Sequence, residues 1–91
     1  MSITEIIAKK LNISKEELER NAIKEWLERK LLLIKSEINE IKTKYNIKSI
    51  NEFKEKIRTG EIKEHPGWED LITLESLLKE KLKIEEALKL I

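Results

Sequence analysis

The sequence predicts an all-α fold: a long antiparallel, coiled-coil-like helical hairpin with two short helices, which dimerises into a helical bundle. Three observations favour this fold. Three serines each precede a glutamate by three residues, as in a helix-capping box, and apolar residues recur at helical spacing through the C-terminal quarter. A further apolar stripe repeats at spacings of 4, 3, 4, 3 and 4 residues, as in a coiled coil. This stripe, called the seam below, consists of Leu27, Leu31, Ile34, Ile38, Ile41 and Tyr45.

The capping boxes and stop residues define the first two helices. Ser2 and Ser14 are the expected N-caps of helices at about 3–11 and 15–45, and Asn12 and Asn46 are the expected left-handed ends. The second helix would be about 46 Å long at 1.5 Å per residue. A compact chain of 91 residues has a diameter of roughly 30 to 35 Å, so this helix outruns a compact domain.

Two further helices complete a single domain over residues 1–91. A third helix at about 50–59 follows the Ser49 cap, places Ile50, Phe53 and Ile57 on one face and stops at Gly60. A fourth at about 66–90 is expected to begin with Pro66 at its first helical position. Because the two long helices are similar in length and joined by a short connector, the simplest arrangement is an antiparallel hairpin.

Both long helices carry more apolar surface than one partner covers. On the fourth helix, we expect one face to pack within the chain: Trp68, Leu71, Leu74, Leu78 and Leu82. A second face, comprising Leu77, Ile84, Ala87, Leu88 and Ile91, is either the far end of the same core or a contact with another chain. The second helix has an excess apolar arc as well: Ala22, Ile23, Trp26, Leu32 and Leu33. We therefore predict a homodimer in which the interacting residues are the seam and Leu77, Ile84, Leu88 and Ile91.

Composition excludes several function classes. The net charge is +1, so net charge alone predicts no strong attraction to nucleic acid or anionic membranes. There is no cysteine, and the longest purely apolar run, residues 31–34, is far too short to span a membrane. No secretion signal is recognisable, so a cytoplasmic location is expected. Enrichment in Lys and Glu is typical of proteins from thermophiles, and we expect such a source.

The N-terminal corner, residues 3–20, has the rhythm of a helix-turn-helix: Ile7 to Ser14, then Leu18. Lys9, Lys10 and Lys15 are its candidate nucleic-acid contacts. Acidic side chains in the expected recognition helix would repel the phosphates of nucleic acid. The first helix also begins at residue 2 or 3, so we expect no room for the supporting helix that normally precedes the unit. We interpret the corner as structural and keep a small DNA-associated regulator as the alternative function.

The segment at residues 61–70 is the other candidate site. A metal site would require the single histidine, His65, to converge with Glu61, Glu64, Glu69 or Asp70, but their spacing is not diagnostic. We favour a helix start, with Pro66 as the first residue and Trp68 as a core anchor. No catalytic triad and no glycine-rich phosphate loop is present, so neither enzyme activity nor a cofactor is expected.

The whole chain resembles a group of small uncharacterised archaeal helical proteins. The resemblance is carried by the Leu11-x-Ile13-Ser14 corner, Leu27 with Leu31, the Lys44-Tyr45-Asn46-Ile47 stretch, Phe53 with Ile57, and Gly60-Glu61-Ile62 followed by Glu64-His65-Pro66 and Trp68-Glu69-Asp70. Residues 45–70 are also similar to small antitoxins of toxin-antitoxin pairs, although Asn46 stands where those proteins have glycine. This second resemblance implies a toxin-like protein partner. The sequence thus predicts a non-enzymatic helical interaction module.

Overall fold

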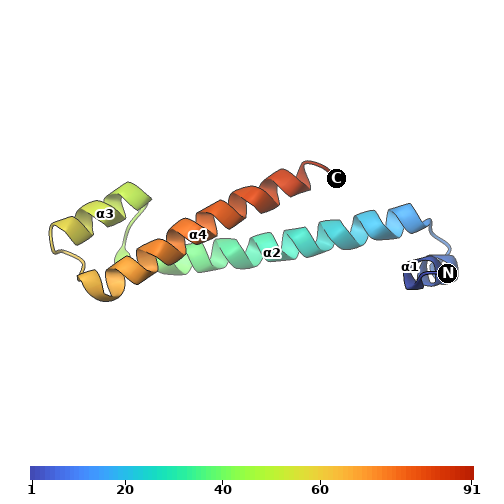
Figure 1. The fold of residues 1–91 in the computed structure, drawn as a ribbon, viewed down its shortest axis with the longest axis horizontal. Coiled ribbons are helices and arrows are strands. Elements are labelled where there is room, and N and C mark those ends of the chain that lie inside the picture. Colours follow the sequence, from blue (N-terminus) through green and yellow to red (C-terminus); the bar gives the residue numbers. More distant parts are fainter.

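The computed structural model describes residues 1–91 and contains four helices and no strand (Figure 1). The helices are α1 (Ile3–Leu11), α2 (Lys15–Tyr45), α3 (Ile50–Arg58) and α4 (Glu64–Leu88). The all-α prediction is confirmed. The molecule measures 61 × 20 × 18 Å and its radius of gyration is 19.4 Å. A compact chain of this length would have a radius of gyration near 12 Å, so the long helix does outrun a compact domain.

Local signals at the helix starts act as predicted. The hydroxyl oxygens of Ser2, Ser14 and Ser49 each accept a hydrogen bond from the backbone N–H three residues on, at 3.2, 3.0 and 3.1 Å. The reciprocal bond of a capping box, from the serine N–H to the glutamate carboxylate, is formed at none of these three caps. The Glu52 carboxylate accepts from the backbone N–H of Lys48, at 2.9 Å, rather than from that of Ser49.

Two asparagines end α1 and α2 in the left-handed conformation, as expected: φ is 58° at Asn12 and 51° at Asn46. In both cases the following isoleucine donates its N–H to the carbonyl five residues back, from Ile13 to Ala8 and from Ile47 to Lys42. This bonding pattern closes the helix end and turns the chain. It also directs Ile47 into the core, where its side chain is buried.

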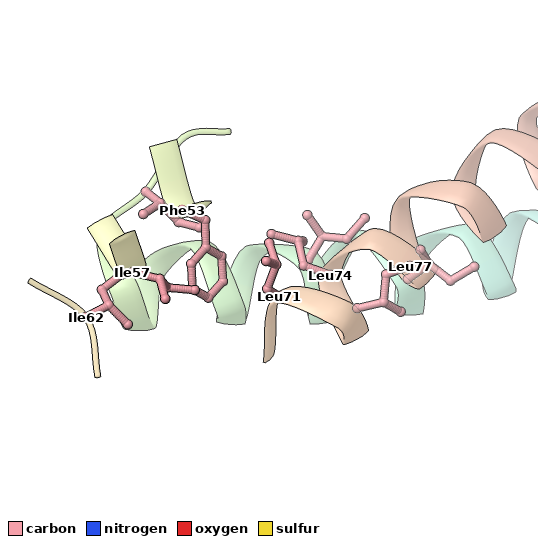
Figure 2. Packing of buried hydrophobic residues seen from close by; sticks show 9 residues of the cluster. Phe53, Ile57, Ile62, Leu71, Leu74 and Leu77 are labelled. Carbon is pink, nitrogen blue, oxygen red and sulfur yellow. The ribbon is translucent and has the colours of Figure 1, made fainter. Parts of the chain in front are cut away.

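Helices α2 and α4 form an antiparallel hairpin, and α3 covers its closed end (Figure 1). The main core lies where these three helices meet. Figure 2 shows Phe53 and Ile57 of α3 directed toward Leu71 of α4. Nine buried side chains make up this core: Ile34, Ile38, Ile47, Phe53, Ile57, Ile62, Leu71, Leu74 and Leu77.

The predicted start and core face of α4 were wrong in part. Pro66 is not the first residue of a regular helix, because the backbone angles of His65 and Pro66 depart from helical values within α4. Gly67 is buried against the side chains of Ile57 and Ile62. Since successive helical residues lie about 100° apart, Trp68 turns away from the core and is 45% exposed. Trp68 is therefore not a core anchor.

One more assignment to the first face was wrong, whereas part of the second face agrees with the alternative that it is the far end of the same core. Leu82, expected in the intrachain core, is 58% exposed. Leu77, placed on the second face, is buried in that core, and Ile84 packs against it. The side of α4 that meets α2 therefore mixes residues from both predicted faces.

Candidate interaction surface

Large apolar side chains are exposed along much of this molecule. Fourteen large hydrophobic residues are exposed, against eleven hydrophobic residues that are buried. Monomeric proteins rarely expose large contiguous apolar patches, and such patches mark interaction sites. The exposed side chains of this molecule are therefore candidates for an interaction site.

The register of the hairpin explains which side chains stay exposed. The Nζ of Lys44 lies 3.0 Å from the Oδ2 of Asp70, and the Nζ of Lys30 lies 3.6 Å from the Oε1 of Glu80. Leu88, the last residue of α4, lies eight residues after Glu80. In an antiparallel pair it therefore comes opposite roughly residue 22 of α2, eight residues before Lys30. The first two turns of α2 therefore extend beyond α4, and Figure 1 shows them projecting toward α1.

Helix α1 covers the projecting part of α2 incompletely. Ala8 is its one buried residue, and Glu5 pairs with Lys15 at 3.7 Å. Between the two helices runs an open groove of about 360 Å³, lined by Ile3, Thr4, Ile7, Leu18, Glu19, Ala22 and Ile23. A second hollow of about 280 Å³ shares Ala22 with this groove and is otherwise lined by Glu25, Trp26 and Arg29.

These two depressions define what we call the N-terminal apolar surface: Ile3, Ile7, Leu18, Ala22, Ile23 and Trp26. Trp26 is 61% exposed and Ile23 is 53% exposed. The α2 residues among them belong to the excess arc noted in the sequence, or lie beside it. Neither Ile3 nor Ile7 was predicted to mediate interaction, although their i, i+4 spacing puts them on one face of α1.

The ten residues predicted to mediate interaction lie mostly inside the chain. Leu27, Ile34, Ile38 and Leu77 are buried. A further five are half-buried: Leu31, Ile41, Tyr45, Ile84 and Leu88. Only Ile91 is exposed. The seam thus lines the inner side of the hairpin, so the surface left for a second chain is the excess arc and not the seam.

Tyr45, at the end of the seam, joins α2 to α4 through a polar cluster. Its hydroxyl donates a hydrogen bond to the Asp70 carboxylate, and its ring packs on Phe53 with centroids 4.7 Å apart. The pKa of Asp70 is lowered, first by this hydrogen bond and then by the Lys44 ammonium. Burial, followed by the hydrogen bond to Asp70, raises the pKa of the Tyr45 hydroxyl. These contacts hold the closed end of the hairpin together.

A hollow of about 460 Å³ lies beside that cluster. Its lining includes Lys44, Lys56 and Lys63, which suggests an anion site. The first two ammonium groups are already paired, Lys44 with Asp70 and Lys56 with Glu52 at 3.5 Å. The hollow therefore offers little free positive charge.

The histidine segment forms no metal-binding group. The side chain of His65 is 89% exposed, and its Nδ1 lies 2.7 Å from the Oε1 of Glu69. No three His, Asp or Glu side chains anywhere in the chain are placed to hold a metal ion together.

The candidate nucleic-acid contacts lie at the N-terminal corner, and all three lysines are exposed. Lys9 and Lys10 lie in the last turn of α1. Lys15 is flanked by Glu5 at 3.7 Å and Glu19 at 3.9 Å, which offset its charge. The corner has the helix–turn–helix connectivity predicted for it, but its second helix continues for 31 residues along the hairpin.

Comparison with known proteins places the chain in a family. A model described as the Uncharacterized protein MJ0235 family matches residues 1–91. The chain belongs to this family. A relative named Uncharacterized protein MJ0235, from the archaeon Methanocaldococcus jannaschii, is 42% identical over 62 residues, which are 68% of this chain and 76% of the relative. No solved structure matches the chain.

The family match supports the resemblance to small archaeal proteins. Neither the family's description nor the relative's name refers to antitoxins. No helix in the structure is both long enough and apolar enough to cross a membrane.

Proposed function

We propose that this protein is a non-enzymatic helical interaction module that forms a homodimer through its N-terminal apolar surface. The observation that carries the proposal is the open groove between α1 and α2, whose walls are mainly apolar side chains. Covering this groove with a second chain would remove the exposed side chains of Ile3, Ile7 and Ile23 from water.

The exposed area of the chain is consistent with dimerisation. The chain exposes 7092 Å², about 1,500 Å² more than a compact monomer of 10.8 kDa would expose. A standard interface buries about 800 Å² on each partner. A dimer of that size would bury roughly half of the excess and still leave the closed end of the hairpin free.

An interaction role also agrees with the chemistry of the side chains. The single histidine is exposed and paired with Glu69, and three of the five serines serve as helix caps. Antitoxin-like activity is a narrower hypothesis that rests on the sequence of residues 45–70. Those residues form the closed end of the hairpin, so a toxin-like partner bound there would be additional to the second copy.

The molar mass in solution tests the proposal. Light scattering after size-exclusion chromatography should give about twice the monomer mass of 10.8 kDa at micromolar concentration. Ile23→Glu places a charge in the groove and should lower the mass toward that of the monomer. Ile72→Glu is the matched control, because Ile72 is 62% exposed but lies near the closed end, on α4. A monomeric mass for the unmodified chain up to about 100 µM would refute the proposal.

A further inference from the structure

Helix α2 carries a second stripe on a side different from the seam. Glu19, Ala22, Trp26 and Arg29 follow one another at spacings of 3, 4 and 3 residues. At 100° per residue, their mean direction lies about 120° around the helix from the seam. Leu33 extends the stripe by one more turn, and Trp26 and Leu33 are both exposed. The stripe crosses the N-terminal apolar surface, because Ala22 lines both of its depressions.

This stripe is complementary to itself when its direction is reversed. Position 24 is the centre of two complementary pairs. The acid Glu19 and the base Arg29 lie five residues on either side of it, and the small Ala22 and the large Trp26 lie two residues on either side. If two α2 helices cross antiparallel at this point, Glu19 of each copy faces Arg29 of the other. Trp26 of each copy likewise faces Ala22 of the other. Lys24 itself points to the opposite side of the helix, so no like charges meet at the centre.

We propose that two copies of the chain associate about a twofold axis near residue 24 of α2, with Trp26 of each copy seated over Ala22 of the other. This proposal rests on the proposed homodimer and specifies its orientation and its central residues. The site is completed only by the second copy, because each Trp26 fills a groove whose walls belong to the other chain. The interface is isologous, as in most soluble dimers.

The groove suits an aromatic side chain. It offers about 360 Å³ between Ile3 and Ile7 of α1 and Leu18 and Ile23 of α2, and Ala22 lines it with only a small side chain. A tryptophan buries 150–250 Å² of surface when it is covered, and buried tryptophans at the centre of an interface contribute most to affinity. Trp26 is available for this role, since it is 61% exposed within the single chain.

Charge determines the orientation. In a parallel pair of α2 helices, Glu19 would face Glu19, Arg29 would face Arg29, and the two Trp26 side chains would collide. The antiparallel pair replaces these repulsions with two Glu19–Arg29 attractions. Both side chains are accessible: the side chain of Glu19 is 48% exposed and that of Arg29 is 73% exposed. The present partner of Arg29 is Glu25, at 2.9 Å on the solvent side, and such exposed pairs contribute little.

Two charge-reversal variants test the proposal. Glu19→Arg and Arg29→Glu each create two like-charge contacts in the dimer and should weaken self-association about tenfold or more, as measured by sedimentation equilibrium. A mixture of the two variants should associate as tightly as the unmodified chain, because each arginine then faces a glutamate. Residues 19 and 29 lie about 15 Å apart along one helix, so this recovery cannot arise within one chain.

A third variant tests the central contact. Trp26→Ala should weaken association on the order of 100-fold or more, with unchanged helix content by circular dichroism. If the unmodified chain is a dimer that Ile23→Glu dissociates, but neither charge reversal weakens it, this orientation is wrong and the proposed homodimer stands. The orientation is equally wrong if both reversals weaken the dimer and their mixture fails to recover. A monomeric unmodified chain would refute both proposals together.

Discussion

Truncation of one fully buried leucine tests the core described for the hairpin. Leu74 is 0% exposed and lies in the nine-residue core on the side of α4 that meets α2 and α3. Leu74→Ala removes three buried methyl or methine carbons and leaves a cavity that helical neighbours cannot readily close. Comparable substitutions in well-packed cores cost about 2.7 to 5 kcal/mol. We expect a loss of about 3 kcal/mol in the free energy of unfolding.

That loss is large for this chain. A domain of 91 residues has a free energy of unfolding of about 5 to 14 kcal/mol. A change of 1 kcal/mol shifts the melting temperature of a domain of this size by about 4 to 8 °C, so Leu74→Ala should lower the Tm by roughly 12 to 24 °C. Urea unfolding followed by far-UV circular dichroism measures the free energy directly. All samples need one fixed protein concentration, because association adds to apparent stability.

The matched control lies two residues away on the same helix. Ile72 is 62% exposed, so Ile72→Ala should change the free energy of unfolding by no more than about 0.5 kcal/mol. The two substitutions have the same helix context and remove side chains of equal size. If Leu74→Ala cost no more than Ile72→Ala, the placement of the α4 core face would be refuted.

Two further substitutions follow from the seam and the polar cluster. Ile38→Lys places an unpaired charge at a buried seam position and should abolish cooperative thermal unfolding; an unchanged Tm and an unchanged mass by light scattering would contradict this. Asp70→Asn keeps the shape of the side chain but removes its charge. Because the pKa of Asp70 is lowered in the folded chain, its carboxylate stabilises the fold above the unfolded pKa of about 3.9, and this contribution is lost as the pH falls through the folded pKa. The stability difference between the unmodified chain and Asp70→Asn should therefore be greatest near neutral pH and vanish in acid, and a difference that stays constant from about pH 7 to pH 2 would exclude the charge as its source.

Helix ends were predictable from sequence because each depends on residues within a few positions. The Ser14 hydroxyl needs only the N–H of Glu17, and Asn46 needs only its own tolerance of positive φ. The seam was predictable for a related reason, since one strong periodic pattern from Leu27 to Tyr45 determines which side of the 31-residue helix α2 faces α4. The hairpin follows from these local signals.

The core face of α4 was not predictable in the same way. Trp68 was expected to be a core anchor because tryptophan is large and apolar. The structure instead turns Gly67 inward, where an added Cβ would lie only 3.1 Å from the Cγ2 of Ile62. The rotation of α4 is thus determined by how closely the connector approaches it. That approach depends on the irregular backbone at His65 and Pro66, which no helical periodicity describes.

The sequence predicted only part of the candidate interface. The excess arc on α2 indicated that a second chain was needed, but which residues remain uncovered depends on where α4 ends against α2. That register is shown by two ion pairs between residues far apart in the sequence, Lys44 with Asp70 and Lys30 with Glu80. The apolar wall supplied by α1 was missed because Ile3 and Ile7 form too short a pattern to be separated from ordinary helix packing.

The distribution of apolar residues along the second stripe argues that association is confined to one end of the hairpin. From Ala22 to Leu33 the stripe offers large exposed side chains, Trp26 above all. Continued toward the closed end at the same spacing, it passes through Ser36, Glu40 and Thr43, all polar and exposed. A second chain that ran along the whole of α2 would have to bury those groups without compensation. Two copies crossing near residue 24 avoid that cost, and they leave both closed ends exposed at opposite ends of the pair.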